Sequence, residues 1–200
     1  TFSIVSTLLP IINCGLKPIF VDCEQQTFNT SIDSILKSIT KKTKLIIVTH
    51  IYGLAVDTYK LKKKISKKIL IVEDCAEAIG LNYRNKPCGF YSDISTYSFY
   101  ANKFLNTGEG GMITTNHQNI YKRCLELKNL FFDNKKRFIH KEIGFNYRYT
   151  NLQAALGIAQ LKKINYVKKY KLKIANAYDK CFKLNTFIQR SIFLRQQELQ

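Results

Sequence analysis

The sequence predicts an α/β fold, a three-layer sandwich in which helices cover both faces of a mostly parallel central sheet. Short apolar runs of strand length alternate along the chain with longer segments of helical character. The clearest run, KLIIVT at 44–49, is apolar over almost its whole length, which is typical of a parallel strand buried on both faces. Strands that alternate with helices in this way indicate a sheet layered by helices.

The expected strands cover 18–22, 44–49, 69–72, 94–99 and 112–115. Each is a short run rich in apolar or β-branched residues. The expected helices cover 31–39, 58–67, 119–130, 151–162 and 165–182. Ser31 and Asp57 are suited to cap the first two helices, because their side-chain oxygens can accept a backbone N–H of the first turn. The last stretch, 191–200, has weak periodicity and is expected to be a frayed end.

The formal net charge of +18 on 200 residues invites a nucleic-acid-binding interpretation. Lysine supplies most of the basic residues and is scattered over helix-like segments such as 59–68 and 162–173, whereas arginine, the better reader of phosphates and bases, is scarce. We therefore interpret the charge as solvated helix faces and expect no nucleic-acid partner. No apolar run approaches the roughly 18 residues that a membrane helix needs, so no membrane partner is expected either.

The cysteines indicate a reducing compartment. The six of them form no CxxC pair and no metal-ligand spacing with the three widely separated histidines. We expect reduced thiols, a cytoplasmic protein and no structural metal. The chain opens on Thr1-Phe2-Ser3 without a starting Met, so we interpret it as a fragment whose beginning is absent.

Lys103 is the most informative single residue, because it stands between the apolar run 94–99 and a glycine-rich exit. An ammonium held between buried segments is costly unless it is paired, neutralised or consumed in a covalent bond. A Schiff base with a carbonyl cofactor would be such a bond and would make the protein an enzyme. The plainer alternative is a loop lysine that points into water. Gly108, Gly110 and Gly111 are expected to permit a tight turn with positive φ beside the lysine.

Polar residues stand at or near the ends of three expected strands, which is the sheet edge where α/β proteins bind ligands. They are His50, the adjacent Glu73 and Asp74, and Ser98. A carboxylate at this position could cap a helix or pair with a cation in the crevice. Lys103 and Asp74 together match the two fixed contacts of pyridoxal phosphate, because a lysine forms the Schiff base and a carboxylate keeps the pyridine nitrogen protonated.

The sequence resembles the DegT/DnrJ/EryC1/StrS family of sugar aminotransferases, which are fold-type I pyridoxal-phosphate enzymes. The resemblance extends to about residue 178 and rests on motifs in the family's order: Thr1-Phe2, GLKPIFVD (15–22), HIYG (50–53), EDCAEAIG (73–80), SDISTYSFYANKFLNTGEGG (92–111), GFNYR (144–148) and NLQAALGIAQL (151–161). Within the family, the 92–111 block and EDCAEAIG look closest to the GDP-4-keto-6-deoxymannose 4-aminotransferases, the GDP-perosamine synthases. The implied fold is the large domain of a fold-type I enzyme, truncated at both ends.

The resemblance implies roles for several residues around pyridoxal 5'-phosphate. Lys103 would form the Schiff base and then move a proton between the substrate carbon and the cofactor. Asp74 would hold the pyridinium, Ser98 would bind the phosphate, and Glu77 would lie near the ring's phenolic oxygen. His50 and its neighbours in the HIYG motif are expected instead to shape the loop after the strand.

Two further residues match family positions at greater distance along the chain. Phe2 corresponds to an aromatic residue that stacks on the cofactor ring, and Asn146 to one that reaches the phosphate of the neighbouring subunit's cofactor, so a homodimer is implied. Each has a plainer alternative. Phe2 could pack in the core, Asn146 could cap a turn, and the Ser98 hydroxyl could bond to backbone.

The implied function is transfer of an amino group from an amino acid, with glutamate expected, to C4 of a nucleotide-linked 4-keto-6-deoxy sugar. Some family members are dehydratases with His at the Schiff-base position, so Lys103 favours transamination. The alternatives are an aminotransferase for a UDP- or dTDP-linked keto-sugar, and an inactive fragment or basic nucleic-acid-binding regulator. Residues 1–164 would form the pyridoxal-phosphate-binding large domain without its N-terminal part, and 165–200 the connecting helix and the start of the small C-terminal domain.

Overall fold

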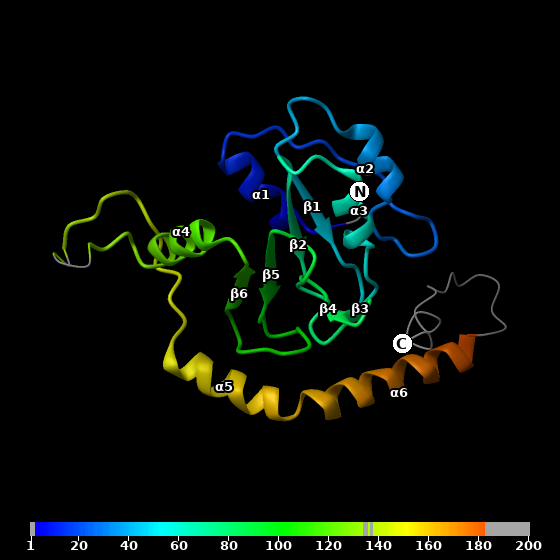
Figure 1. Cartoon of the computed structure of the whole chain (residues 1–200). Helices are drawn as coiled ribbons and strands as arrows, with labels where there is room; N and C mark the ends of the chain where they lie inside the picture. Colours follow the sequence, from blue (N-terminus) through cyan, green and yellow to red (C-terminus); the bar gives the residue numbers. More distant parts are fainter. Residues whose placement is uncertain (1–2, 134–135, 137, 183–200) are drawn as a thin grey trace.

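A computed structural model describes residues 3–133, 136 and 138–182 of the chain. Its centre is a four-stranded sheet in the order β1, β2, β5, β6, formed by Leu45–Thr49, Leu70–Asp74, Ile94–Ser98 and Gly111–Thr115 (Figure 1). The first three strands are parallel, and β6 is antiparallel to β5. The mostly parallel sheet predicted from the sequence is therefore confirmed.

Helices lie on both faces of this sheet, which confirms the predicted three-layer arrangement. They are α1 (Val5–Asn13), α2 (Ile32–Ser38), α3 (Thr58–Lys64), α4 (Gln118–Lys128), α5 (Asn151–Lys162) and α6 (Ile164–Phe182), and a small hairpin adds β3 (Asn82–Tyr83) and β4 (Lys86–Pro87). α2 and α3 cover one face, because Ile35 and Leu61 share the main buried cluster with Val48 of β1. α1 lies on the other face, where Thr7 donates a hydrogen bond to Asp74 of β2.

The core between the sheet and α2 and α3 follows from strand alternation. Successive side chains of a strand point to opposite faces, so Ile46 and Val48 of β1 face the same helices as Ile71 of β2. Leu61 of α3 is fully buried against them. Burial of each such side chain contributes about 1.5–3 kcal/mol, which makes this layer the main source of hydrophobic stabilisation.

Two predicted helix starts are confirmed by their caps. The Ser31 hydroxyl and the Asp57 carboxylate each accept a backbone N–H of the first helical turn, at 3.4 Å and 2.8 Å. α3 ends at Lys64, short of the predicted end at residue 67. The reason is that Ile65 takes an extended conformation, which cannot continue the helix.

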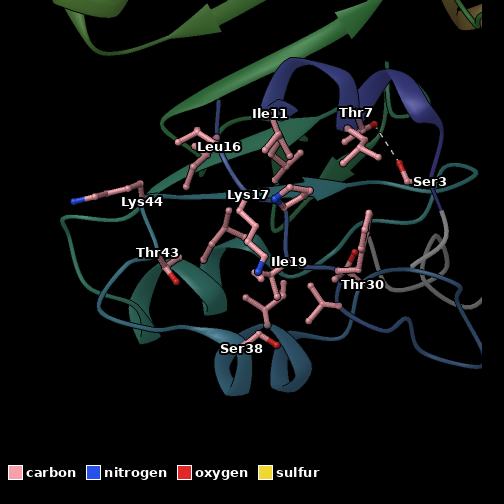
Figure 2. A pocket seen from close by; sticks show the side chains of 18 of the residues that line it. Ser3, Thr7, Ile11, Leu16, Lys17, Ile19, Thr30, Ser38, Thr43 and Lys44 are labelled. Carbon is pink, nitrogen blue, oxygen red and sulfur yellow. Dashed lines mark hydrogen bonds between the residues drawn. The ribbon is translucent and has the colours of Figure 1, made fainter. Parts of the chain in front are cut away.

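The strand predicted at 18–22 does not form, and this prediction was wrong. A strand needs a hydrogen-bonded neighbour, and within the described ranges the one bridge near this segment joins Cys23 to Thr30. Ile19 and Phe20 are 64% and 63% exposed. A cavity of about 1080 Å³ lies between this segment and β1, and Figure 2 shows Ile19 on its lining. The segment therefore has no neighbouring strand at hydrogen-bonding distance among the residues that the structure describes, although its apolar pattern is typical of a strand inside a sheet.

α5 and α6 run along the carboxyl edge of the parallel strands (Figure 1). Gln153 Nε2 donates to the backbone oxygen of Glu109 (3.0 Å), and Lys168 Nζ donates to that of Gly80 (3.3 Å). A capping box begins α5, whose predicted bounds are confirmed. These helices thus contact the loop after β2 and the loop between β5 and β6, on the side of the sheet edge where the predicted site residues stand.

All six cysteines are free, and Cys75 and Cys88 are buried. In the part of the chain that the structure describes, no group of three or more His, Cys, Asp or Glu side chains could hold a metal ion. None of the described helices combines the length and apolar character needed to span a membrane. The end predicted to fray, 191–200, lies outside the described residues.

Candidate active site

The carboxyl edge of the sheet gathers polar residues from three neighbouring strands. The parallel registers place Asp74 of β2 beside Thr49 of β1 and Thr96 of β5. Residues paired across strands point to the same face, and so does Ser98, two positions after Thr96. Asp74 and Ser98 therefore share one face of the sheet, the face that α1 covers, at the edge where α/β sheets bind ligands.

Asp74 accepts hydrogen bonds on both carboxylate oxygens. The Thr7 hydroxyl of α1 donates to Oδ2 (3.0 Å), and the Ala76 N–H donates to Oδ1 (3.1 Å). A turn rather than a helix follows β2, so the helix-cap alternative for this carboxylate is wrong. An ionised carboxylate has about four acceptor positions, so Asp74 retains capacity for a cationic donor.

Glu73 faces away from Asp74, although the two are adjacent. β2 extends through both residues, beyond its predicted end at 72, so their side chains alternate between faces. Glu73 is 2% exposed, and its Oε1 lies 3.2 Å from His50 Nε2. Burial raises the pKa of Glu73, but the interactions with His50, Thr58 and Ser92 together outweigh burial and hold the pKa below its ordinary value. Glu73 and His50 thus share the carboxyl edge with Asp74 but not its face, and the structural role expected for His50 agrees with this position.

Lys103 stands in the loop between β5 and β6. Its Nζ lies 3.7 Å from Glu77 Oε1, and its side chain is 21% exposed. Two backbone hydrogen bonds hold this loop, from the Phe99 N–H to Gly110 and from the Thr107 N–H to Phe99, both at 2.9 Å. The side chain is therefore mostly buried and its ammonium is paired with a carboxylate, which disagrees with the alternative of a lysine that simply points into water.

Glu77 connects the Lys103 loop to the loop that follows β1. Its Oε2 accepts a hydrogen bond from the Tyr52 N–H (2.9 Å), while its Oε1 faces Lys103. Tyr52 and Gly53 have φ angles of 50° and 77°, which form a turn in the left-handed region. The carboxylate is thereby held between a backbone donor and the ammonium.

The glycine-rich exit agrees with the prediction at two positions and differs at the third. Gly108 and Gly110 have φ angles of +77° and +126°, which favour glycine. A Cβ at Gly110 would also lie 2.5 Å from the Tyr149 ring. Gly111 is the first residue of β6, and its constraint is space, because a Cβ there would lie 2.7 Å from the backbone oxygen of Tyr97.

The other predicted site residues are less closely connected. The Ser98 hydroxyl accepts a hydrogen bond from the Tyr100 N–H (3.3 Å), which leaves its own proton to donate. Asn146 is exposed, and its Oδ1 accepts from Arg148 Nε (2.8 Å). Among the described residues, no hydrogen bond or ion pair joins Asn146 to the residues at the sheet edge. Phe2 lies outside the described residues.

Thr7 is the site residue that the sequence analysis missed. It donates to Asp74, and Ser3 Oγ donates to Thr7 Oγ1 (3.2 Å), as Figure 2 shows. The sequence feature that could have indicated Thr7 is a hydroxyl residue within the otherwise apolar helix VSTLLPIIN. That helix also carries Ser6, and the pattern alone does not say which of the two hydroxyls faces the sheet.

These side chains suit the cofactor that the family resemblance implies. Lys103 offers an amine, Asp74 a carboxylate with spare acceptor capacity, and Ser98 a hydroxyl proton. The amine can react with the cofactor's carbonyl, the carboxylate can hold its protonated pyridine nitrogen, and the hydroxyl can donate to its phosphate. Asp74 and Ser98 share one face of one sheet edge, so the donor set fits pyridoxal phosphate.

Comparison with known proteins agrees with this geometry. The DegT/DnrJ/EryC1/StrS aminotransferase family matches residues 1–197. The chain is 40% identical over 179 residues to GDP-perosamine synthase from Vibrio cholerae, which covers 89% of this chain and 49% of that protein. The chain thus spans about half the length of the curated relatives it matches.

Solved structures give the same answer. Helicobacter pylori PseC, an aminotransferase involved in the biosynthesis of pseudoaminic acid, superposes with a TM-score of 0.86 at 29% identity, covering 92% of this chain and 50% of that one. A sugar aminotransferase from Streptococcus pneumoniae in its PLP form gives 0.82 at 26% identity, covering 91% and 52%. Aminotransferases of this family use pyridoxal phosphate, which confirms the expected cofactor. With the predicted fold and the motif resemblance both confirmed, the chain belongs to the DegT/DnrJ/EryC1/StrS aminotransferase family.

Proposed function

We propose that the protein is a pyridoxal-phosphate-dependent aminotransferase that moves an amino group from glutamate to C4 of a nucleotide-linked 4-keto-6-deoxy sugar. The identity of 40% to GDP-perosamine synthase supports a GDP-linked sugar. The observation that carries the proposal is the Lys103 amine paired with Glu77, three residues beyond Asp74 at the end of β2. A lysine at this position favours transamination over the dehydration catalysed by relatives with His there.

Each residue at the edge has a defined task in this proposal. Pyridoxal phosphate, when bound, supplies an electrophilic carbonyl and an electron-withdrawing ring. Lys103 would hold that carbonyl through its amine and would serve as the base that moves a proton from the substrate carbon. Asp74 keeps a proton on the ring nitrogen, because a nearby carboxylate favours the charged form of a base. Thr7 orients Asp74 through its hydrogen bond.

The remaining assignments complete the proposed site. Ser98 would donate its hydroxyl proton to the phosphate, and Glu77 would lie near the phenolic oxygen while it orients the Lys103 ammonium. Phe2 would stack on the ring. Asn146, which is exposed and apart from the other residues, would reach the site of a second subunit in a homodimer.

The proposal also divides the chain. Residues 1–164 would belong to the cofactor-binding large domain, and 165–200 would begin the small domain. The start of α6 at Ile164 coincides with that boundary. A cytoplasmic location stays a prediction, and the free thiols agree with it.

Borohydride reduction of the protein loaded with pyridoxal phosphate tests the cofactor assignment. We expect peptide mapping to find the pyridoxyl group covalently bound to Lys103. K103R is the matched control, because it keeps the positive charge without an amine that can attack the carbonyl. A pyridoxyl group on another lysine, or equal labelling of K103R, would contradict the assignment.

A panel of keto-sugars with glutamate tests the substrate. We expect the GDP-linked 4-keto-6-deoxy sugar to be aminated fastest, and faster turnover of a UDP- or dTDP-linked sugar would select the alternative aminotransferase. The nucleic-acid-binding alternative predicts a different behaviour, which is an affinity for nucleic acid that falls steeply as salt is raised. Such binding without amination of any sugar in the panel would overturn the enzyme proposal.

A further inference from the structure

His50 ties the end of β1 to the far end of the loop 51–56. Its Nδ1 accepts a hydrogen bond from the Val56 N–H (3.1 Å), and its Nε2 lies 3.2 Å from Glu73 Oε1. Because Nδ1 accepts, the ring hydrogen lies on Nε2 and is donated to Glu73. The ring is 1% exposed and both nitrogens are engaged, so its orientation is fixed.

Asn29 holds the near end of the same loop. It is 3% exposed, its Oδ1 accepts from the Ile51 N–H (2.8 Å), and its Nδ2 donates to the backbone oxygen of Leu54 (3.0 Å). Asn29, His50 and Glu73 together form a loop clamp. Asn29 and His50 are bonded directly to the loop backbone, and Glu73 acts through the His50 ring. Breaking either direct contact would leave a buried donor or acceptor unpaired, which is costly, so the contacts restrict the loop.

The clamped loop has one contact that leads toward the proposed catalytic amine. The Tyr52 N–H donates to Glu77 Oε2 (2.9 Å), and Glu77 Oε1 lies 3.7 Å from Lys103 Nζ. Tyr52 has a φ angle of 50°, a conformation that a residue with a side chain adopts only when its surroundings hold it there. The direction of the Tyr52 N–H therefore depends on how firmly the loop is fixed.

We propose that the loop clamp positions Lys103. By fixing the loop, His50, Glu73 and Asn29 fix the Tyr52 N–H, which orients Glu77 against the ammonium. His50 and Glu73 lie on the face of the sheet opposite to Asp74, so they are positioning residues rather than catalytic ones. This inference rests on the role proposed for Lys103 as the catalytic amine.

Competitive acetylation of the cofactor-free protein at pH 8 tests the clamp, with Lys62 as the internal reference and mass spectrometry as the readout. An amine held in an ion pair with a carboxylate is less available to the reagent than a free amine, and Glu77 is the carboxylate paired with Lys103. E77Q should therefore raise the relative labelling of Lys103 by about twofold to fivefold, the range for a partly exposed ion pair.

Two substitutions of His50 separate positioning from simple stability. H50Q offers a donor near the Nε2 position and no acceptor for the Val56 N–H, whereas the amide oxygen of H50N takes the place of Nδ1. We expect H50Q to raise Lys103 labelling toward the E77Q value and H50N to keep it near wild type. The double variant H50Q/E77Q should label no faster than E77Q, because both changes break one chain of contacts.

The controls make each outcome decisive. F131A removes a buried side chain after α4, outside the cluster that holds Val56 of the loop, so it should lower stability and leave Lys103 labelling unchanged. If H50Q does not fold, N29D tests the same clamp, because it keeps the acceptor for Ile51 and loses the donor to Leu54; it should raise the labelling as well. Wild-type labelling in folded H50Q and N29D would overturn the inference. Since no cofactor is present, that failure is distinct from a failure of the borohydride experiment.

Discussion

At the amino edge of the sheet, one carboxylate has three hydrogen-bond partners in the described part of the protein, one more than Asp74 has. Asp93 Oδ1 is bonded to Lys62 Nζ and to His117 Nε2, and its Oδ2 accepts the Ile71 N–H (2.8 Å). The Thr115 hydroxyl donates to the Asp93 backbone oxygen (2.7 Å). The carboxyl edge carries the same types of side chain, but its Asp74 keeps acceptor capacity, and its Lys103 has one partner at 3.7 Å.

The difference shows that the same types of side chain can stabilise the fold at one edge of a sheet and remain available to a ligand at the other. A carboxylate whose partners all come from the fold contributes to stability, because breaking any contact leaves a buried group unsatisfied. A carboxylate and an amine that are held in place but not saturated can still engage a ligand. Variants at the two edges should therefore separate activity from stability.

Replacement of the two lysines should give the largest contrast. K103M removes the proposed nucleophile and base, so turnover should fall by about 10²–10⁴-fold with little change in stability. K62M removes a partner of the nearly buried Asp93, so stability should fall by about 1–3 kcal/mol while turnover is kept. Amination assays and urea denaturation measure the two effects. An equal loss of turnover in both variants would contradict the division between the edges.

Replacement of the two aspartates should give the next contrast. D74N cannot hold a proton on the ring nitrogen, so turnover should fall by about 10²–10³-fold. D93N places an amide NH₂ where an oxygen accepts from Lys62 or from the Ile71 N–H, so it should cost about 1–3 kcal/mol of unfolding free energy. If D74N proved the more destabilising of the two, Asp74 would be a structural carboxylate.

The pH dependence of stability sharpens this comparison. Burial raises the pKa of Asp93, but the hydrogen bonds from Lys62, the Ile71 N–H and His117 outweigh burial and hold the pKa below its ordinary 3.8. A carboxyl group with a lowered pKa in the folded state stabilises the protein above its unfolded pKa, and the contribution is lost as pH falls through the folded pKa. The unfolding free energy of wild type minus that of D93N should thus be constant above about pH 5 and shrink below about pH 4. A difference that grows on acidification would contradict the assignment.

The parallel core was predictable because its signals are local. The run at 44–49 is apolar whichever residues pair with it, and the cap residues Ser31 and Asp57 act within one helical turn. The segment 18–22 shows the limit of such signals. Its composition predicts a strand, but strand formation depends on a neighbour at hydrogen-bonding distance, and a cavity lies between this segment and β1.

The candidate site was predictable in part for a similar reason. The position of Asp74 after an apolar run predicted that it lies at the carboxyl edge of the sheet, because this edge follows from chain order and parallel pairing. The face that Glu73 and Asp74 each take depends on whether β2 continues through them, because side chains alternate between faces only within the strand. β2 does continue, since the buried partner His50 stabilises the Glu73 carboxylate inside the strand. Thr7 was missed because its partner is distant in sequence, and only packing brings α1 over Asp74.

A matched pair of threonines gives the smallest contrast between the edges. Valine has nearly the shape of threonine, so T7V and T115V each remove a hydroxyl with little loss of packing. T7V removes the donor that orients Asp74, and we expect turnover to fall by about twofold to tenfold, which corresponds to a hydrogen bond of about 0.5–1.5 kcal/mol. T115V removes the donor to the Asp93 backbone and the acceptor of the His117 N–H, so the same energy should appear as lost stability with turnover unchanged. If T7V lowered stability and spared turnover, α1 would serve only to cover the sheet, and Asp74 would need no orienting hydroxyl.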